Sequence, residues 1–224
     1  MKLLTFYSDS HKELYEEFFL ESYNRLLKDS FELNARHINQ LSKTGEYNAE
    51  GFSETMVEKL NHIIANIDIT DDEPLVFADC DIQFFSDFSE DIKNELDDYD
   101  VKFQNDVVCR CAGFFVAKQS EEVLNFFRMM RELLLKNIKP GIDDQVILNS
   151  MINQNMDLGV KHGMLPNNKY FTVAASSTGP KQWNGEDFEV PKELLVHHGN
   201  WTVGLDNKFK LMRMVKNKMM INAD

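Results

Sequence analysis

The sequence predicts an α/β fold in which helices cover a mainly parallel central sheet. Segments with the apolar spacing of helices alternate along the chain with short apolar segments that are typical of strands. Leu75 to Ala78 is a continuous apolar run, as expected for a strand covered on both faces. No repeat, low-complexity run or Pro/Gly-rich linker divides the 224 residues, so we expect a single domain over residues 1–224.

The individual elements follow from capping residues, apolar spacing and breakers. A capping-box pattern begins at Ser10, acidic residues follow Ser120 in a first helical turn, and Pro140–Gly141 ends the helix that starts at Ser120. In chain order we expect a strand at 2–7, a helix from Ser10 to about Lys28, a strand from Phe31, a polar loop at 39–51, a helix from Ser53, a strand at 75–78, a helix at 87–96, a strand at 109–118, a helix from Ser120 to Lys136, a helix at 143–151, short strands near 158–164 and 170–174, a core segment at 193–201 and a basic, Met-rich tail at 207–224.

The charge balance excludes one broad class of partner. The chain has 24 basic and 37 acidic residues, for a formal net charge of -13. Such a field repels phosphate backbones, so we expect no nucleic-acid partner, and a nucleotide would need a local cation. The basic tail could contact an anionic membrane surface, although cations at a helix C-terminus are the commoner explanation.

The termini, hydropathy and cysteines indicate a cytoplasmic protein. The N-terminal apolar run is too short for a signal peptide, and no apolar stretch approaches the length of a membrane span. Cys80, Cys109 and Cys111 are an odd number of cysteines without the second pair that a zinc site needs. We therefore expect free thiols in a reducing compartment.

Two carboxylates stand at the end of the most apolar strand. Asp79 and Asp81 follow Leu75–Ala78 directly, and alternate residues of a strand point the same way. At a strand end that opens into a crevice, this pair suits Mg²⁺ or Mn²⁺, which could bridge the oxygens of a diphosphate. A solvated turn that caps the next helix, or an aspartyl nucleophile, remains an alternative, whereas the glycine and distant glutamate of an EF-hand are missing.

The order of four motifs is more specific than the acidic pair alone. "LVFADCDIQFFSDF", "CAGFFVAKQSEEVLNFF", "DDQVILNSMI" and "HHGNWTVGLDNK" follow one another along the chain. This order resembles the nucleotide-diphospho-sugar transferases of the GT-A glycosyltransferase fold, over about residues 2–210. The resemblance implies a GT-A fold with a single Rossmann-like domain.

The resemblance also implies roles for particular residues. In the family the acidic pair and a late histidine hold the metal, and a lysine and several residues near the strand ends contact the nucleotide sugar. The implied metal ligands are Asp79, Asp81 and His198, with His197 as the alternative one position away. The implied donor contacts are Asp79, Lys59, Lys208, Gly113 and Gln145, with Thr5, Tyr7 and Ser8 beside the base. The implied catalytic residue is Asp144, which orients the sugar or acts on the acceptor.

The implied function is a metal-dependent glycosyltransferase. It would move a hexose from a nucleotide-diphosphate sugar, with UDP favoured, to a hydroxyl of a glycan or other acceptor, with Mn²⁺ or Mg²⁺ as cofactor. A sugar nucleotidyltransferase is the enzymatic alternative, but the segment after the first strand lacks the glycine-rich loop of such enzymes. A non-catalytic nucleotide-sugar or carbohydrate-binding domain is the other. We also expect residues 197–208 to be mobile without ligand and to close over the donor phosphates.

Overall fold

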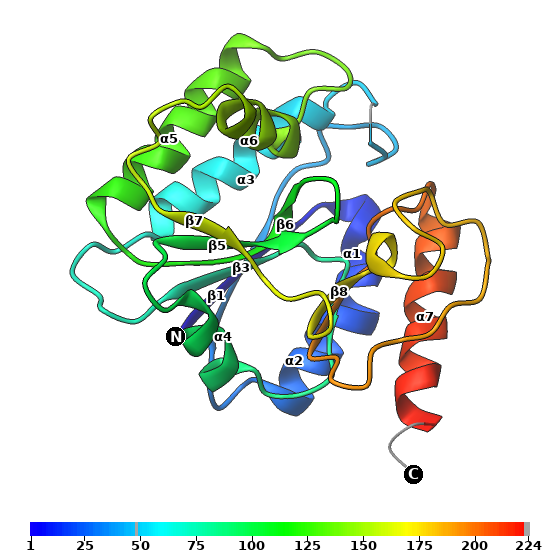
Figure 1. The fold of residues 1–224 in the computed structure, drawn as a ribbon. Coiled ribbons are helices and arrows are strands. Elements are labelled where there is room, and N and C mark those ends of the chain that lie inside the picture. Colours follow the sequence, from blue (N-terminus) through cyan, green and yellow to red (C-terminus); the bar gives the residue numbers. More distant parts are fainter. Residues whose placement is uncertain (48, 222–224) are drawn as a thin grey trace.

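Six strands form the central sheet in the order β2-β1-β3-β6-β5-β7 (Figure 1). A computed structural model describes residues 1–47 and 49–221 of the chain. The elements of the central sheet and its flanking helices are β1 (Lys2–Tyr7), η1 (Asp9–His11), α1 (Lys12–Leu14), η2 (Tyr15–Leu20), α2 (Glu21–Leu26), β2 (Glu32–His37), α3 (Phe52–Asn66), β3 (Leu75–Ala78), α4 (Ser89–Leu96), β5 (Val101–Asn105), β6 (Arg110–Ala117), α5 (Glu121–Lys136), α6 (Asp144–Asn153) and β7 (His162–Met164).

The central sheet is mainly parallel, as predicted. Three of its five adjacent pairs are parallel, namely β1–β2, β1–β3 and β5–β7. The β6 strand is the exception, because it runs antiparallel to both of its neighbours, β3 and β5. The strand β5 was not predicted, and a short loop joins it to β6 in a hairpin.

Both faces of the sheet are buried, and successive strand residues enter two different cores. In β3, Leu75 and Phe77 pack into one core with α3, α5 and α6, whereas Val76 and Ala78 pack into the other with Phe19 and its neighbours. Figure 1 shows α3, α5 and α6 on one side of the sheet and α2 and α4 on the other. Alternation of side chains along a strand therefore explains why every residue of this strand is apolar.

A second, smaller sheet extends the fold beyond the end of β3. It has the order β4-β9-β8, with β4 at Ile82–Phe84, β8 at Tyr170–Thr172 and β9 at Val196–His198. A single turn, η3 (Val173–Ala175), follows β8, and the helix α7 (Leu205–Ile221) packs beside this sheet (Figure 1). The predicted core segment at 193–201 thus contains a strand, and most of the predicted tail is a helix.

Of the two helix caps predicted from the sequence, at Ser10 and Ser120, the cap at Ser120 is confirmed. Ser120 accepts a hydrogen bond from the backbone N–H of Val123 at the start of α5, and Asp143 caps α6 by accepting from Val146. The predicted N-cap at Ser10 is wrong, because the helical segment begins at Asp9 and Ser10 lies within its first turn. The Ser10 hydroxyl instead lies 2.9 Å from Nδ1 of His11.

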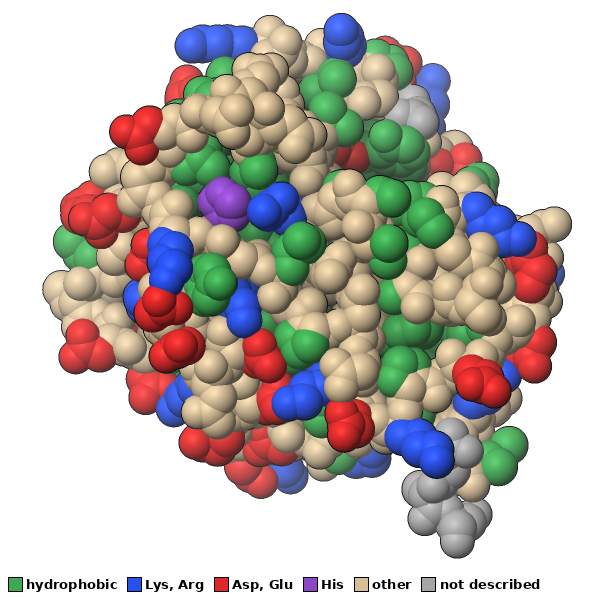
Figure 2. All heavy atoms as spheres, viewed as in Figure 1, with side chains coloured by type: hydrophobic (Ala, Val, Ile, Leu, Met, Phe, Trp, Pro, Cys, Tyr) green, Lys and Arg blue, Asp and Glu red, His purple; other side chains and the backbone are tan. Residues whose placement is uncertain are grey.

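Most of the cationic side chains of α7 form ion pairs with carboxylates of the same chain. Arg213 pairs with Glu17, Lys216 with Glu21 and Lys218 with Asp187. The first two contacts link α7 to the N-terminal helical segment, and the third links it to the loop that contains Asp187. Contact of the basic tail with a membrane surface stays a prediction. On the face in Figure 2, acidic side chains are most frequent over the lower left, with basic ones among them.

All three cysteines are free, as predicted. Within residues 1–47 and 49–221, every helix is too short or too polar to span a bilayer. The cytoplasmic location stays a prediction.

Candidate functional site

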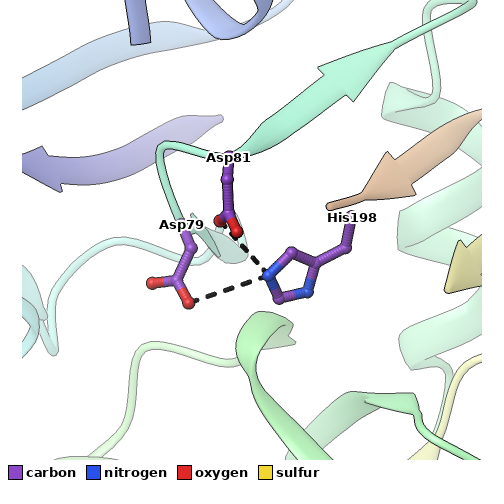
Figure 3. A group of neighbouring side chains, drawn as sticks. All are labelled: Asp79, Asp81 and His198. Carbon is purple, nitrogen blue, oxygen red and sulfur yellow. Dashed lines mark ion pairs between the residues drawn. The ribbon is translucent and has the colours of Figure 1, made fainter. Parts of the chain in front are cut away.

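The short link between β3 and β4 and the pairing of β4 with β9 bring Asp79, Asp81 and His198 together (Figure 3). Asp79 follows β3, and Asp81 precedes β4, whose first residue Ile82 pairs with His198 of β9. His198 Nε2 lies 3.3 Å from an oxygen of Asp81 and 4.0 Å from an oxygen of Asp79. One ligand atom from each of the three residues lies within 4.8 Å of the other two.

Gly113 of β6 provides the space between these side chains. Its carbonyl accepts a hydrogen bond from the backbone N–H of Asp79, so the two backbones run side by side. A Cβ added at Gly113 would lie 2.3 Å from Cε1 of His198 and 2.5 Å from Oδ2 of Asp79. Any residue with a side chain would therefore collide with both potential ligands, and glycine is required here by the site.

Two lysines contact the carboxylates from opposite sides. Lys59 of α3 is buried, and its ammonium lies 3.1 Å from Asp79 and 2.8 Å from Asp144. Lys208 of α7 lies 2.5 Å from the other oxygen of Asp81. Burial would lower the pKa of Lys59, but Asp144 and Asp79 raise it above its ordinary value, so the lysine stays charged.

The two carboxylates of the acidic pair differ in their electrostatics. Burial raises the pKa of Asp79 to about 6, against the opposing effect of Lys59. Burial acts in the same direction on Asp81, but the ammonium of Lys208 holds its pKa well below the usual range. Asp81 therefore carries a charge under all ordinary conditions, and Asp79 gains most from an additional cation.

Of the two adjacent histidines, only His198 faces the acidic pair. Its Nδ1 lies 2.9 Å from Oε1 of Gln104, so its Nε2 points towards the carboxylates. The His197 ring lies on the other side of β9, with Nδ1 3.0 Å from the amide nitrogen of Gln83. Burial lowers the pKa of His197 to about 3. The alternative of His197 as a ligand therefore has no support in this geometry.

A cavity of about 540 Å³ opens beside the acidic pair and collects most of the predicted site residues. Its wall contains the predicted residues Tyr7, Ser8, Lys59, Asp79, Asp81, Gly113, Asp144, Gln145, His198 and Lys208. His197 and Thr5 are the exceptions, and the side chain of Thr5 is completely buried within β1 and does not reach the wall. The predicted contact of Thr5 with a ligand is thus not supported, whereas Tyr7 and Ser8 lie at the wall.

Gln145 connects the wall of the cavity to β6 through its amide. Its Oε1 accepts a hydrogen bond from the backbone N–H of Ala112, and its Nε2 lies 3.5 Å from Asp106. Asp106 also accepts two hydrogen bonds from Asn200, at 3.0 and 3.2 Å. Asp106 and Asn200 line the cavity but were absent from the predicted site. Their sequence positions carry only a weak signal, since each is a polar residue next to a strand.

Residues 197–208, predicted as one mobile segment, combine three kinds of structure. His197 and His198 end β9 and are buried, while Lys208 lies in the first turn of α7. Residues 199–204 between them have no helix or strand, although the backbone N–H of Gly199 donates to the carbonyl of Asp81. A movement on ligand binding would therefore concern mainly residues 199–204.

The donor set fits a divalent cation such as Mn²⁺ or Mg²⁺. Carboxylate oxygens are the ligands that hard cations prefer, and a neutral imidazole nitrogen is a common metal ligand. Gly113 keeps the space between the three groups free of side-chain atoms. Lys208 and Lys59 add positive charge on either side, which suits a bound diphosphate.

Comparisons with known proteins show the family and the fold of the chain. Residues 20–212 match the model of the nucleotide-diphospho-sugar transferase family. A glycosyltransferase involved in glycosylation of the major capsid of the virus PBCV-1 has a similar structure, with a TM-score of 0.62 and 11% identity over 95% of this chain and 98% of that one. The galactosyltransferase LgtC, in complex with donor and acceptor sugar analogues, gives a TM-score of 0.55 and 10% identity over 96% of both chains. The predicted GT-A fold is confirmed.

Two further comparisons are less informative. The glycosyltransferase GlyE of Streptococcus pneumoniae TIGR4 gives a TM-score of 0.48 and 13% identity over 75% of this chain, which spans only 45% of the length of GlyE. No curated protein matches the chain by sequence.

Proposed function

Because the chain belongs to the nucleotide-diphospho-sugar transferase family and is a glycosyltransferase of the GT-A fold, we propose that it transfers a sugar from a UDP-sugar to a hydroxyl of a carbohydrate acceptor, with Mn²⁺ or Mg²⁺ as cofactor. One observation carries the proposal. Asp79, Asp81 and His198 converge around the space beside Gly113, at the wall of a cavity large enough for a nucleotide sugar.

Different residues of the chain would contact the diphosphate and the uracil of the donor. Asp79, Asp81 and His198 would hold the cation, which supplies positive charge against the diphosphate leaving group. Lys208, whose ammonium lies 2.5 Å from Asp81, would contact the donor phosphates beside this site. Tyr7 and Ser8, at the end of β1, would border the uracil.

Asp144 is proposed to orient the transferred sugar. Its carboxylate lies 2.8 Å from the ammonium of Lys59, which fixes the side chain at the wall of the cavity. A carboxylate held in this way can accept hydrogen bonds from sugar hydroxyls. In the reaction the bond from the anomeric carbon to the diphosphate breaks, a bond to the acceptor oxygen forms, and the acceptor hydroxyl releases its proton to the departing diphosphate.

The charges of the cavity favour a neutral sugar. Within the described part of the chain, the wall contains six carboxylates, from Glu46, Asp79, Asp81, Asp106, Asp143 and Asp144, and two lysines. Both lysines already contact carboxylates. A uronic acid would therefore add a negative charge near Asp143 and Asp144 without a free cation to receive it.

Calorimetric titration of UDP tests the metal-dependent site. We expect UDP to bind in the presence of Mn²⁺ and to lose most of its affinity when EDTA removes the metal. The variant Asp81→Asn should abolish the metal-dependent part of the affinity. Asp187→Asn is a matched control, because it also removes the aspartate of an Asp–Lys pair but lies outside the cavity. Equal UDP binding by the wild type with and without Mn²⁺ would refute the metal site.

A comparison of donors tests the proposed sugar and the reaction. UDP-glucose and UDP-glucuronate differ only by the carboxylate at C6. A like charge about 10 Å away costs about 1.7 kcal/mol at an effective dielectric constant of about 20, so UDP-glucuronate should bind roughly 20-fold more weakly. Slow metal-dependent hydrolysis of UDP-sugars by the purified protein would show turnover, whereas tight binding without any turnover or transfer would favour the non-catalytic alternative.

A further inference from the structure

Two adjacent histidines in β9 each contact a buried glutamine through the same ring nitrogen. Nδ1 of His198 lies 2.9 Å from the side-chain oxygen of Gln104, and Nδ1 of His197 lies 3.0 Å from the side-chain nitrogen of Gln83. Both glutamines and both histidines are at most 3% exposed. A neutral imidazole has one nitrogen that donates and one that accepts, so the hydrogen bond at Nδ1 decides the role of Nε2.

The backbone fixes the orientation of the Gln104 amide. Its Nε2 lies 3.3 Å from the carbonyl oxygen of Phe171, which can only accept a hydrogen bond. The nitrogen of the amide must therefore face Phe171, and the oxygen faces His198. Since that oxygen accepts, Nδ1 of His198 must carry a proton. The thiol sulfur of Cys111, also a possible acceptor, lies 3.6 Å from the same Nδ1.

The amide of Gln83 has the opposite orientation, with its nitrogen towards the histidine. Its amide nitrogen lies 3.0 Å from the carbonyl oxygen of Met212 and 3.0 Å from Nδ1 of His197. The carbonyl again requires the nitrogen at this end of the amide, so Nδ1 of His197 must accept and its proton must sit on Nε2. The two glutamines thus place the protons of neighbouring histidines on different ring nitrogens.

We infer that Gln104 is the positioning residue that makes His198 a metal ligand, because it holds the proton on Nδ1 and leaves the lone pair of Nε2 facing Asp79 and Asp81. Without Gln104, a proton on Nε2 could form a hydrogen bond to Asp81, whose oxygen lies 3.3 Å away. That tautomer has no lone pair for a metal at this position. The inference rests on the proposed metal site, and it goes beyond it by assigning a role to a residue that touches neither metal nor donor.

The fold explains how a strand residue reaches the histidine. The register between β5 and β6 shifts after Phe103, so that Phe103 pairs with Phe115 but Gln104 pairs with Cys111. Such an irregularity re-aims a side chain. It places Gln104 and Cys111 opposite each other and next to His198, while Gly113, in the extra residues of β6, pairs with Asp79.

Nitrogen NMR of the metal-free protein, labelled in its histidine rings, tests the proton positions directly. At mildly alkaline pH we expect the wild type to carry a proton on Nδ1 of His198 and on Nε2 of His197. Gln104→Met, which has nearly the same shape, should move the His198 proton to Nε2, whereas Gln104→Glu can still accept from Nδ1 and should keep it in place. Gln83→Met is the matched control and should affect His197 only.

Metal affinity provides the second readout. Loss of an outer partner of a metal-binding histidine lowers affinity by roughly 10–100-fold, so Gln104→Met should weaken Mn²⁺ binding by this amount in calorimetry. Gln104→Glu and Gln83→Met should remain within a few-fold of the wild type. An unprotonated Nδ1 on His198 in the wild type, or unchanged Mn²⁺ affinity in folded Gln104→Met, would overturn the inference. A wild type that has the expected protons but does not bind Mn²⁺ would instead overturn the proposed metal-dependent function.

Discussion

Replacing Gly113 by alanine tests whether the space beside it belongs to a metal site. Non-bonded carbon atoms normally lie about 3.5–4.0 Å apart, whereas the new Cβ would lie 2.3 Å from Cε1 of His198. Either His198 or Asp79 must therefore move by about 1 Å. Metal sites tolerate only about 0.2 Å of variation in ligand distance, so one ligand should be lost. We expect Mn²⁺ affinity to fall roughly 100-fold, or by about 2.7 kcal/mol.

A strand glycine away from the site provides the control for this experiment. A Cβ at Gly163 of β7 would lie 2.9 Å from the ring of Tyr99, so Gly163→Ala also introduces a close contact. Each variant should lose about 1–3 kcal/mol of stability through overpacking, measured by thermal unfolding. Only Gly113→Ala should weaken Mn²⁺ and UDP binding in calorimetry. Wild-type affinity in a folded Gly113→Ala protein would refute the argument that His198 and Asp79 hold the metal.

Three further variants probe the charged residues around the cavity. Asp144→Asn should lower kcat far more than it raises KM for the donor, and near-normal turnover in steady-state kinetics would exclude its proposed role. Lys59→Met leaves two carboxylates without their buried cation and should destabilise the fold by about 3 kcal/mol, which chemical denaturation would detect. Burial, and to a smaller extent the charge of Asp144, raise the pKa of Asp143 to about 6, above its value in the unfolded chain. The ionised form of Asp143 is therefore less favourable in the folded protein, and this lowers the free energy of unfolding above about pH 6. The loss of stability becomes smaller as the pH falls towards 4. Asp143→Asn keeps the cap of α6 and should therefore stabilise the protein by about 2 kcal/mol at pH 7 but hardly at pH 4, and an equal effect at both pH values would contradict this.

The elements that were predicted well carry their signal in a few consecutive residues. Leu75–Ala78 is apolar at every position because both faces of β3 are buried, and the caps of α5 and α6 lie within one turn of the helix that they begin. The direction of β6 has no such local signal. Whether a buried strand runs parallel or antiparallel to its neighbours depends on the connections, and the hairpin from the unpredicted β5 decides it here.

Site residues could be predicted from the sequence where they form a motif. Those that come together only through the pairing register of two strands could not. Asp79 and Asp81 stand together in the sequence, and the family resemblance added His198, Lys59 and Lys208. Gln104 was missed because only the register shift between β5 and β6 turns it towards His198. The choice between two adjacent histidines likewise depends on which face of β9 each occupies.

The wide separation of the metal ligands along the chain has a consequence for biosynthesis. Asp79 and His198 are about 120 residues apart, and a ribosome adds roughly 5–20 residues per second, so the two carboxylates emerge many seconds before their histidine. Until β9 pairs with β4, the nascent chain has the carboxylates and Lys59 but neither the imidazole nor Lys208. We therefore expect a partly synthesised chain to be unable to capture cation and donor. The ability to bind cation and donor would then arise in one late step, when residues 196–208 leave the ribosomal exit tunnel and β9 pairs with β4.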